Sequence, residues 1–169
     1  THSGNAEIYI MDLIDKSLRP LTNHWAADVD PSISPDGESL SFLSGRSGKP
    51  MIYVMSTEGR EKEVKRISFV GEFNATPRFS RDGKKIIFSS WLDNRFDLFM
   101  IGAAGDSLVR LTKDFGSNED PTFSPDNEFI AFSSQRIIGA NKEKKHIHIM
   151  TTEGEIIKKI TSGSSIYQS

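Results

Sequence analysis

His146 and His148 are the residues most suggestive of metal chemistry in this 169-residue chain. They lie two positions apart in a short apolar segment, and alternate side chains of a strand point to the same face. A structural zinc site takes four ligands, but the sequence offers no third or fourth ligand beside this pair and contains no cysteine. We therefore interpret His148 as a packed aromatic side chain, at the position that Tyr9, Tyr53 and Phe99 hold in similar segments. The sequence predicts no metal site and no cofactor.

Three aspartates, Asp36, Asp82 and Asp126, recur in one local setting, two residues after a serine and directly before a glycine or an asparagine. A catalytic carboxylate would not be repeated in every unit of a repeat protein, whereas a turn would, and aspartate side chains commonly cap turns. The chain also lacks a Gly-x-Ser-x-Gly nucleophile elbow, a P-loop and a dinucleotide-binding glycine pattern. We therefore predict no catalytic residue and no enzyme activity within this chain.

These turns belong to a repeat that occurs three times, at intervals of 46 and 44 residues, in the octapeptides Asp30–Gly37, Thr76–Gly83 and Asp120–Asn127. Short segments with period-two spacing of large side chains follow each turn, and no segment has the 3.6-residue period of a helix. Four short strands in about 45 residues are typical of a β-propeller blade. We predict an all-β fold of four-stranded antiparallel blades. The residues expected near the axis are Ile33, Phe79 and Phe123, and those expected between blades are Phe42, Phe88 and Phe132.

At this period the chain divides into about three and a half blades. Residues 1–29 are expected to form the second half of a preceding blade with its connecting loop, and the blades are expected to span 30–75, 76–119 and 120–169. Such an open array leaves apolar blade faces uncovered, so we expect self-association through these faces.

Charge and hydropathy argue against nucleic-acid binding and against a membrane-spanning helix. The net charge is −2 with both signs interspersed, which gives no support to nucleic-acid binding. The mean hydropathy is −0.40, and no apolar run approaches the roughly 20 residues of a membrane-spanning helix.

Candidate binding residues lie in the loops that join the fourth strand of one blade to the first strand of the next, residues 23–30, 69–76 and 113–120, and in the loops between second and third strands. In a propeller these loops converge at one end of the channel, and loops on a rigid scaffold commonly carry binding residues. Acids there could steer a basic partner or hold a cation, and aromatics could anchor an interface. The alternative is solvated acids and aromatics that seal gaps between blades. The candidate partner-binding residues are Trp25, Asp28, Asp30, Glu72, Asn74, Trp91, Glu119 and Asp120.

The repeat pattern, from the proline through Ser-Pro-Asp-Gly to Ile-Tyr-Val-Met and Leu-Thr, resembles the propeller repeats of the TolB family of the Tol-Pal system. Residues 3–12 and 80–90 are particularly similar, and the resemblance covers essentially the whole chain. It implies a six-bladed propeller with a central channel, no catalysis, a periplasmic or otherwise exported location, and docking of a Pal-like lipoprotein over the channel mouth.

Similar repeats also occur in the propeller domains of prolyl-oligopeptidase-like and tricorn-like peptidases. A propeller that gates a peptidase whose catalytic domain lies outside this chain is therefore one alternative, and a sugar-binding or cation-binding propeller is another.

Overall fold

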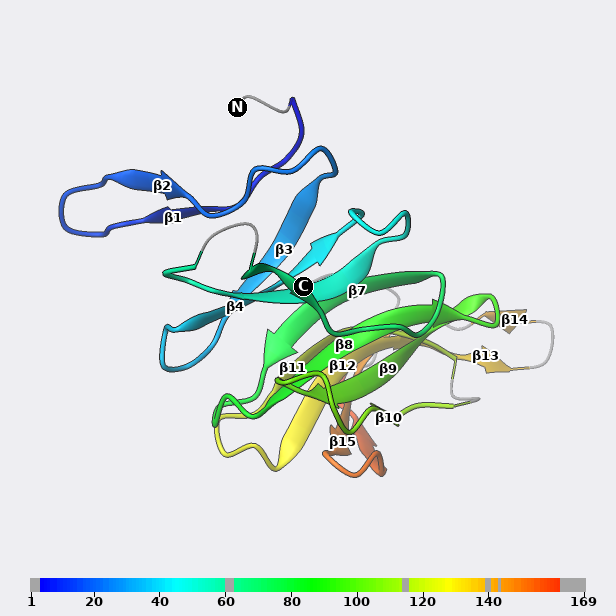
Figure 1. The fold of residues 1–169 in the computed structure, drawn as a ribbon. Coiled ribbons are helices and arrows are strands. Elements are labelled where there is room, and N and C mark those ends of the chain that lie inside the picture. Colours follow the sequence, from blue (N-terminus) through cyan, green and yellow to red (C-terminus); the bar gives the residue numbers. More distant parts are fainter. Residues whose placement is uncertain (1–3, 60–62, 114–115, 139–140, 143, 162–169) are drawn as a thin grey trace.

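Three four-stranded antiparallel sheets make up most of the protein (Figure 1). In each sheet the strands lie side by side in the order in which they occur in the sequence. The structure is a computed structural model that describes residues 4–59, 63–113, 116–138, 141–142 and 144–161. In these residues it contains no α-helix. The all-β prediction and the prediction of four-stranded antiparallel blades are therefore confirmed.

The strands of each blade follow one another in sequence. The first blade contains β3 (Asp28–Ile33), β4 (Ser39–Ser44), β5 (Met51–Ser56) and β6 (Lys65–Arg66). The second contains β7 (Phe73–Phe79), β8 (Lys85–Leu92), β9 (Arg95–Gly102) and β10 (Val109–Arg110). The third contains β11 (Ser117–Phe123), β12 (Phe129–Gln135), β15 (His146–Thr151) and β16 (Ile156–Lys159).

Two small hairpins complete the described strands. The first, β1 (Tyr9–Met11) with β2 (Leu18–Pro20), precedes the first blade. The second, β13 (Ile137–Ile138) with β14 (Asn141–Lys142), lies in the connection between β12 and β15, the second and third strands of the third blade.

The first strand of every blade begins two or three residues before the repeat boundary expected from the sequence, and it contains a β-bulge. The register with the second strand shifts between Val29 and Ser32 in the first blade, and at the same place in the other two. The residue before each bulge proline has a positive φ: 52° at Asp30, 50° at Thr76 and 53° at Asp120. A bulge lets a strand continue past a proline, which has no backbone N–H to donate to the neighbouring strand. Asp30 and Asp120 therefore lie within strands and not in the connecting loops that the sequence suggested.

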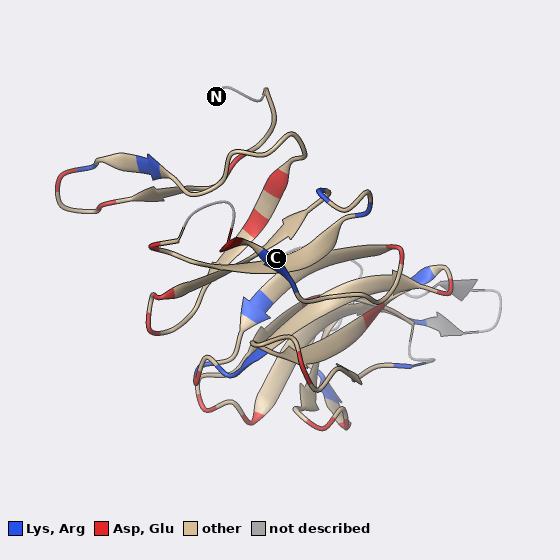
Figure 2. Ribbon diagram, viewed as in Figure 1, with Lys and Arg blue, Asp and Glu red and all other residues tan. Residues whose placement is uncertain are grey.

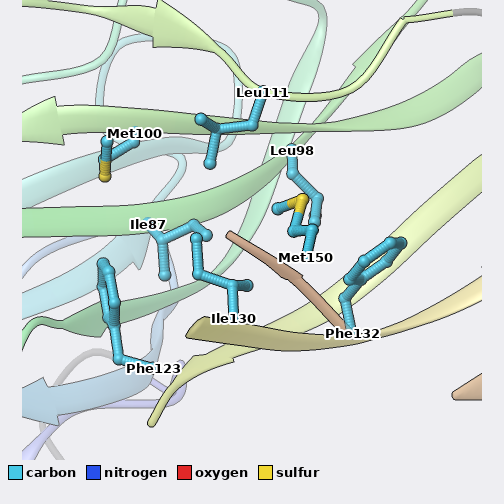
Figure 3. Close-up of a cluster of buried hydrophobic side chains, with 8 residues drawn as sticks. All are labelled: Ile87, Leu98, Met100, Leu111, Phe123, Ile130, Phe132 and Met150. Carbon is cyan, nitrogen blue, oxygen red and sulfur yellow. The ribbon is translucent and has the colours of Figure 1, made fainter. Parts of the chain in front are cut away.

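The hydrophobic core is divided into three clusters, each lying between one blade and the unit before it. Figure 3 shows the cluster between the second and third blades, where Leu98 and Leu111 meet Ile130 and Phe132. The same repeat positions supply the other two clusters. Phe42, Phe88 and Phe132 are at most 1% exposed, so their predicted place between blades is confirmed.

A pair of rings lies inside each blade, across the second and third strands. The ring centroids are 6.0 Å apart for Phe42 with Tyr53 and for Phe88 with Phe99. In the third blade the Phe132 ring lies 5.7 Å from the ring of His148, which is 3% exposed. His148 is therefore a packed aromatic substitute, as predicted.

Burial makes the stability of the third blade dependent on pH. Desolvation lowers the pKa of His148 below its ordinary value of 6.5, and the nearby charges of Arg136 and Lys159 act in the same direction. The unfolded chain therefore takes up a proton below pH 6.5 that the folded chain does not, so the free energy of unfolding falls as the pH drops from 6.5 toward the folded pKa.

We expect the His148→Phe variant to lose much less stability than the parent chain when the pH is lowered from about 7.5 to about 5.5. Urea midpoints at a series of pH values measure this difference. Tyr53→Phe changes the equivalent ring of the first blade and leaves His148 in place, so its pH dependence should match the parent. An unchanged slope in His148→Phe would contradict the buried neutral imidazole.

The three repeated turns are capped by their aspartates, as the sequence predicted. In the second blade, Asp82 Oδ1 accepts hydrogen bonds from Ser80 Oγ at 2.6 Å and from the Lys84 backbone N–H at 3.1 Å. These two hydrogen bonds lower the pKa of the Asp82 carboxyl, and the bond from the serine has the larger effect. The equivalent bonds in the other two turns lower the pKa of Asp36 and of Asp126. The residue after each aspartate has a positive φ, 78° and 70° at the two glycines and 63° at Asn127.

The β1–β2 hairpin packs on the first blade through Ile8 and Leu21, which belong to the first cluster. Half-buried Ile10 also packs against this cluster. The other side chains of residues 9–20 are exposed, including Met11 at 48% and Leu13 at 76%. Among the described strands β1 pairs with β2 alone, so its other edge is unpaired and could pair with another chain. Deleting the hairpin would uncover the first cluster, so a charge on β1 is the better test of association through this edge.

We expect the chain to self-associate at high micromolar concentration, and Met11→Lys to shift it toward monomer because a lysine on an edge strand discourages pairing with another strand. Light scattering measures the molar mass of the parent chain and of the Met11→Lys variant. A parent chain that stays monomeric would contradict the expectation. As a control, Lys65→Met makes the reverse change, from lysine to methionine, on the fourth strand of the first blade.

Candidate interaction face of the propeller

The blades have two distinct ends. We call the end with the β4–β5 and β8–β9 connections the loop end, and the end with the three aspartate-capped turns the turn end. The first strands run from the loop end to the turn end: Asp28 pairs with Ser44 beside the β4–β5 connection, and Ile33 pairs with Leu40 beside the turn. All eight candidate binding residues lie at or near the loop end, but their environments differ.

Asp28 is buried and belongs to the internal structure of the first blade. It is 1% exposed, and its Oδ2 accepts a hydrogen bond from Arg46 Nη2 at 2.8 Å. The Arg46 guanidinium lies over the Phe42 and Tyr53 rings, 5.3 and 5.1 Å from their centroids. The charge of Asp28 is thus neutralised inside the blade, and its position differs from the exposed loop position suggested by the sequence.

Asn74 holds the equivalent position of the second blade and is also buried, with no exposed surface. Its Nδ2 donates to Val70 O at 2.9 Å and to Ser90 Oγ at 3.0 Å, and its backbone N–H donates to Pro50 O of the preceding blade at 2.9 Å. Asn74 therefore positions the loop before β7 and joins two blades. A partner on the surface does not reach it.

The remaining acids are exposed or half-buried, and two of them are paired with lysines. Glu72 forms an ion pair with Lys49, and Glu119 Oε2 accepts from Lys145 Nζ at 3.0 Å. Asp30 is exposed, and half-buried Asp120 accepts a long 3.5 Å bond from Ser133 Oγ. Figure 2 shows the acidic bands on β3, which carries Asp28 and Asp30. The unneutralised negative charge at the loop end is therefore smaller than the sequence suggests.

A row of three aromatic residues crosses the loop end of the second blade. Trp91 on β8 pairs with Phe73 on β7 and with Phe96 on β9. The Phe96 ring centroid lies 5.0 Å from that of Trp91 and 6.0 Å from that of Phe73, both edge to face. Phe73 is 36% exposed, and the other two are half-buried. We call this row the aromatic row.

The turn next to the aromatic row explains its geometry. Asp93 and Asn94 both have positive φ, 53° and 62°, which is the conformation of a two-residue turn that matches strand twist. This turn sets Trp91 opposite Phe96. The Asp-Asn pair between two aromatic-containing segments is the sequence signal for Phe96, which was not among the predicted binding residues.

Trp25 is the most exposed aromatic among the candidates, at 68%. It lies in the loop between β2 and β3, and its ring centroid is 5.3 Å from that of His24. A solvent-exposed indole does not seal a gap between blades, so Trp25 is available for contact.

A buried carboxylate that sequence reasoning did not identify lies next to the aromatic row along β9. Asp97, next to Phe96, has no exposed surface. Its Oδ2 accepts from Arg110 Nη2 at 2.5 Å, and its Oδ1 accepts from Thr112 Oγ1 at 2.9 Å and from Asn118 Nδ2 at 3.5 Å. These bonds tie β9 to the connection that enters the third blade.

The described residues of the loop end combine half-buried aromatic side chains with ion pairs. In this part of the chain, no group of three or more His, Asp or Glu side chains is placed to hold a metal ion. No described helix is long and apolar enough to cross a membrane. Half-buried aromatics on a rigid sheet, flanked by ion pairs, resemble the anchors and polar rim of a protein interface.

The repeated four-stranded sheets, with a core cluster between successive units, define a β-propeller repeat protein. Residues 1–97 match the family model of the TolB beta propeller domain. The chain belongs to this family.

A relative and two solved structures illustrate the similarity. The chain is 34% identical over 134 residues to the protein TolB homolog of Chlorobium chlorochromatii. The aligned region covers 79% of this chain and 30% of that protein. The crystal structure of TolB from Acinetobacter baumannii matches with a TM-score of 0.75 and 30% identity, over 90% of this chain and 37% of that one. A puromycin-hydrolyzing peptidase of Mycobacterium tuberculosis matches with a TM-score of 0.69 at 15% identity, over 94% and 28% of the two chains, a likeness of fold alone.

The chain spans about a third of the length of these TolB relatives.

Proposed function

We propose that this chain is a non-catalytic interaction module that binds a polypeptide partner at its loop end. By its TolB family membership, the partner is a Pal-like lipoprotein and the location is the periplasm or another exported compartment. The aromatic row of Phe73, Trp91 and Phe96 is the observation that carries the proposal. Large aromatic side chains in partly buried positions are the residues that dominate binding energy at protein interfaces.

Because most acids of the loop end are neutralised, we expect aromatic contacts to contribute more to partner binding than long-range electrostatic attraction of the partner. Asp28 is neutralised inside the blade, and Glu72 and Glu119 are paired with lysines. Asp30 and Asp120 remain to orient a basic segment of the partner, and Trp25 offers a second apolar contact. Rim charges of this kind alter association rates more than affinity.

Calorimetric titration with the soluble domain of the Pal-like lipoprotein from the same genome tests the proposal. Replacing Trp91 with alanine should weaken binding about thirtyfold, the effect of losing a hot-spot tryptophan worth about 2 kcal/mol. Leu108→Ala removes an exposed apolar side chain at the turn end and should leave the affinity unchanged.

Because Trp91 is half-buried, thermal melts of the variant are needed to show that it folds. Trp25→Ala serves as a second variant, since Trp25 is exposed and its loss should weaken binding without affecting the melt. No binding by the folded parent chain, or equal binding by all variants, would contradict the proposal.

A further inference from the structure

A cavity of about 220 Å³ lies at the turn end of the innermost strands, and three successive blades contribute to it. Its apolar wall comes from Ile33, Phe79 and Phe123, which hold one repeat position in the three blades. The cavity is at the opposite end of β3, β7 and β11 from the aromatic row, so it is separate from the face described above.

Two arginines of the middle blade give this cavity its chemical character. Arg78 stands where the neighbouring blades have Ser32 and Thr122, and Arg81 stands where the first blade has Pro35. A blade needs neither arginine to form, since the other two blades fold without them. The positive charge is therefore a property of this cavity and not of the repeat.

Neither arginine is neutralised by the protein. Within the described residues, no carboxylate lies within ion-pair distance of Arg78 or Arg81. The half-buried Arg78 side chain donates a hydrogen bond from Nη1 to the neighbouring Pro77 O at 2.8 Å. The nearby turn aspartates are occupied: Asp36 and Asp82 each accept bonds from a serine hydroxyl and a backbone N–H of their own turn. Figure 2 shows the basic band at the end of β7, which carries Arg78.

Hydrogen bonds between blades hold the walls of the cavity in place. The Arg81 backbone N–H donates to Asn127 Oδ1 of the third blade at 2.7 Å. The Phe79 backbone N–H donates to Ser32 Oγ of the first blade at 3.4 Å. A site whose walls are already fixed loses less entropy when a ligand binds.

We propose that this cavity binds a carboxylate on a short apolar stem, presented by an acidic side chain of a polypeptide segment. A guanidinium donates two parallel hydrogen bonds to a carboxylate, and two unpaired guanidiniums beside an apolar wall favour such a group over a neutral one. The cavity is smaller than the roughly 300–1,000 Å³ of sites for whole small-molecule ligands, which suits one inserted side chain.

The inference goes beyond the proposed function because it uses no residue of the loop end. Its failure would leave the loop-end interface untouched, and loss of the loop-end interface would leave this cavity intact.

Nuclear magnetic resonance titration of the full chain with the tripeptide acetyl-Leu-Glu-Leu-amide tests the assignment. We expect shifts of the Phe79, Arg81 and Phe123 amides, and binding at least tenfold weaker for the matched acetyl-Leu-Gln-Leu-amide. Arg78→Gln and Arg81→Gln should each weaken binding of the acidic tripeptide at least fivefold. Arg19→Gln, which alters an exposed arginine of the β1–β2 hairpin, should leave it unchanged.

Three results would overturn the proposal: equal binding of the two tripeptides, shifts confined to the loop end, or tighter binding of isovalerate than of the acidic tripeptide, which would make this a site for a free organic acid. Thermal melts check that each variant folds. Should Arg78→Gln unfold the chain, the exposed Arg81 side chain still provides the test.

Discussion

Replacing Asp97 with alanine is expected to lower the free energy of unfolding by about 3 kcal/mol, because breaking a buried ion pair leaves charged and polar groups without their partner. The variant loses the acceptor of Arg110, Thr112 and Asn118 at once. The arginine is about a quarter exposed and so keeps some hydration, which places the expected cost at the lower end of the range for buried pairs.

Asp93→Ala is the matched control for this variant. Asp93 lies 3.9 Å from the same arginine, Arg110, but its side chain is 67% exposed. A surface ion pair contributes at most about 1 kcal/mol. Urea denaturation measures the free energy of unfolding of both variants. If the two variants lose similar amounts of this free energy, Asp97 is not the acceptor at the centre of a buried network.

Replacing Phe88 with alanine is expected to cost about 3–5 kcal/mol, the range for removing a buried phenylalanine and leaving a cavity. Phe88 has no exposed surface, stacks on Phe99 with ring centroids 6.0 Å apart, and belongs to the cluster between the first and second blades. The loss should therefore affect both blades and reduce the cooperativity of unfolding, because blades are held together by their shared faces.

Phe69→Ala provides the comparison for Phe88→Ala. Phe69 is 73% exposed, and its main contact is the Arg66 guanidinium, 4.4 Å from the ring centroid. An exposed cation–π contact is worth about 0.5–1 kcal/mol, so this variant should melt close to the parent chain. Thermal unfolding followed by circular dichroism measures both, and a Phe88→Ala variant as stable as Phe69→Ala would contradict the core between blades.

The sequence predicted the blades and the residues between them because these features repeat. Turn chemistry recurs with an aspartate and a positive-φ residue in each blade, and large apolar residues recur at fixed intervals on the strands. Phe42, Phe88 and Phe132 could therefore be placed between blades, and His148 could be assigned to an aromatic position, from spacing alone.

The candidate site was harder to predict because its residues do not repeat. The position of Asp97 holds Glu7, Met51 and His146 in the other units, so no pattern indicated a buried carboxylate there. Burial of Asp28 and Asn74 depends on bulged first strands that begin before the repeat boundary. A positive φ before proline is disfavoured locally and is imposed by the surrounding sheet, which sequence patterns do not reveal.

The central claim, that the loop end of these blades is the partner-binding face, is tested most directly by amide hydrogen exchange with and without the soluble domain of the Pal-like lipoprotein. We predict slower exchange, in the complex, of amides around Phe73, Trp91 and Phe96 and of the loop that contains Trp25. Exchange at the three aspartate-capped turns should not change. Protection confined to the turn end, or no protection when the two proteins are at saturating concentration, would contradict the claim.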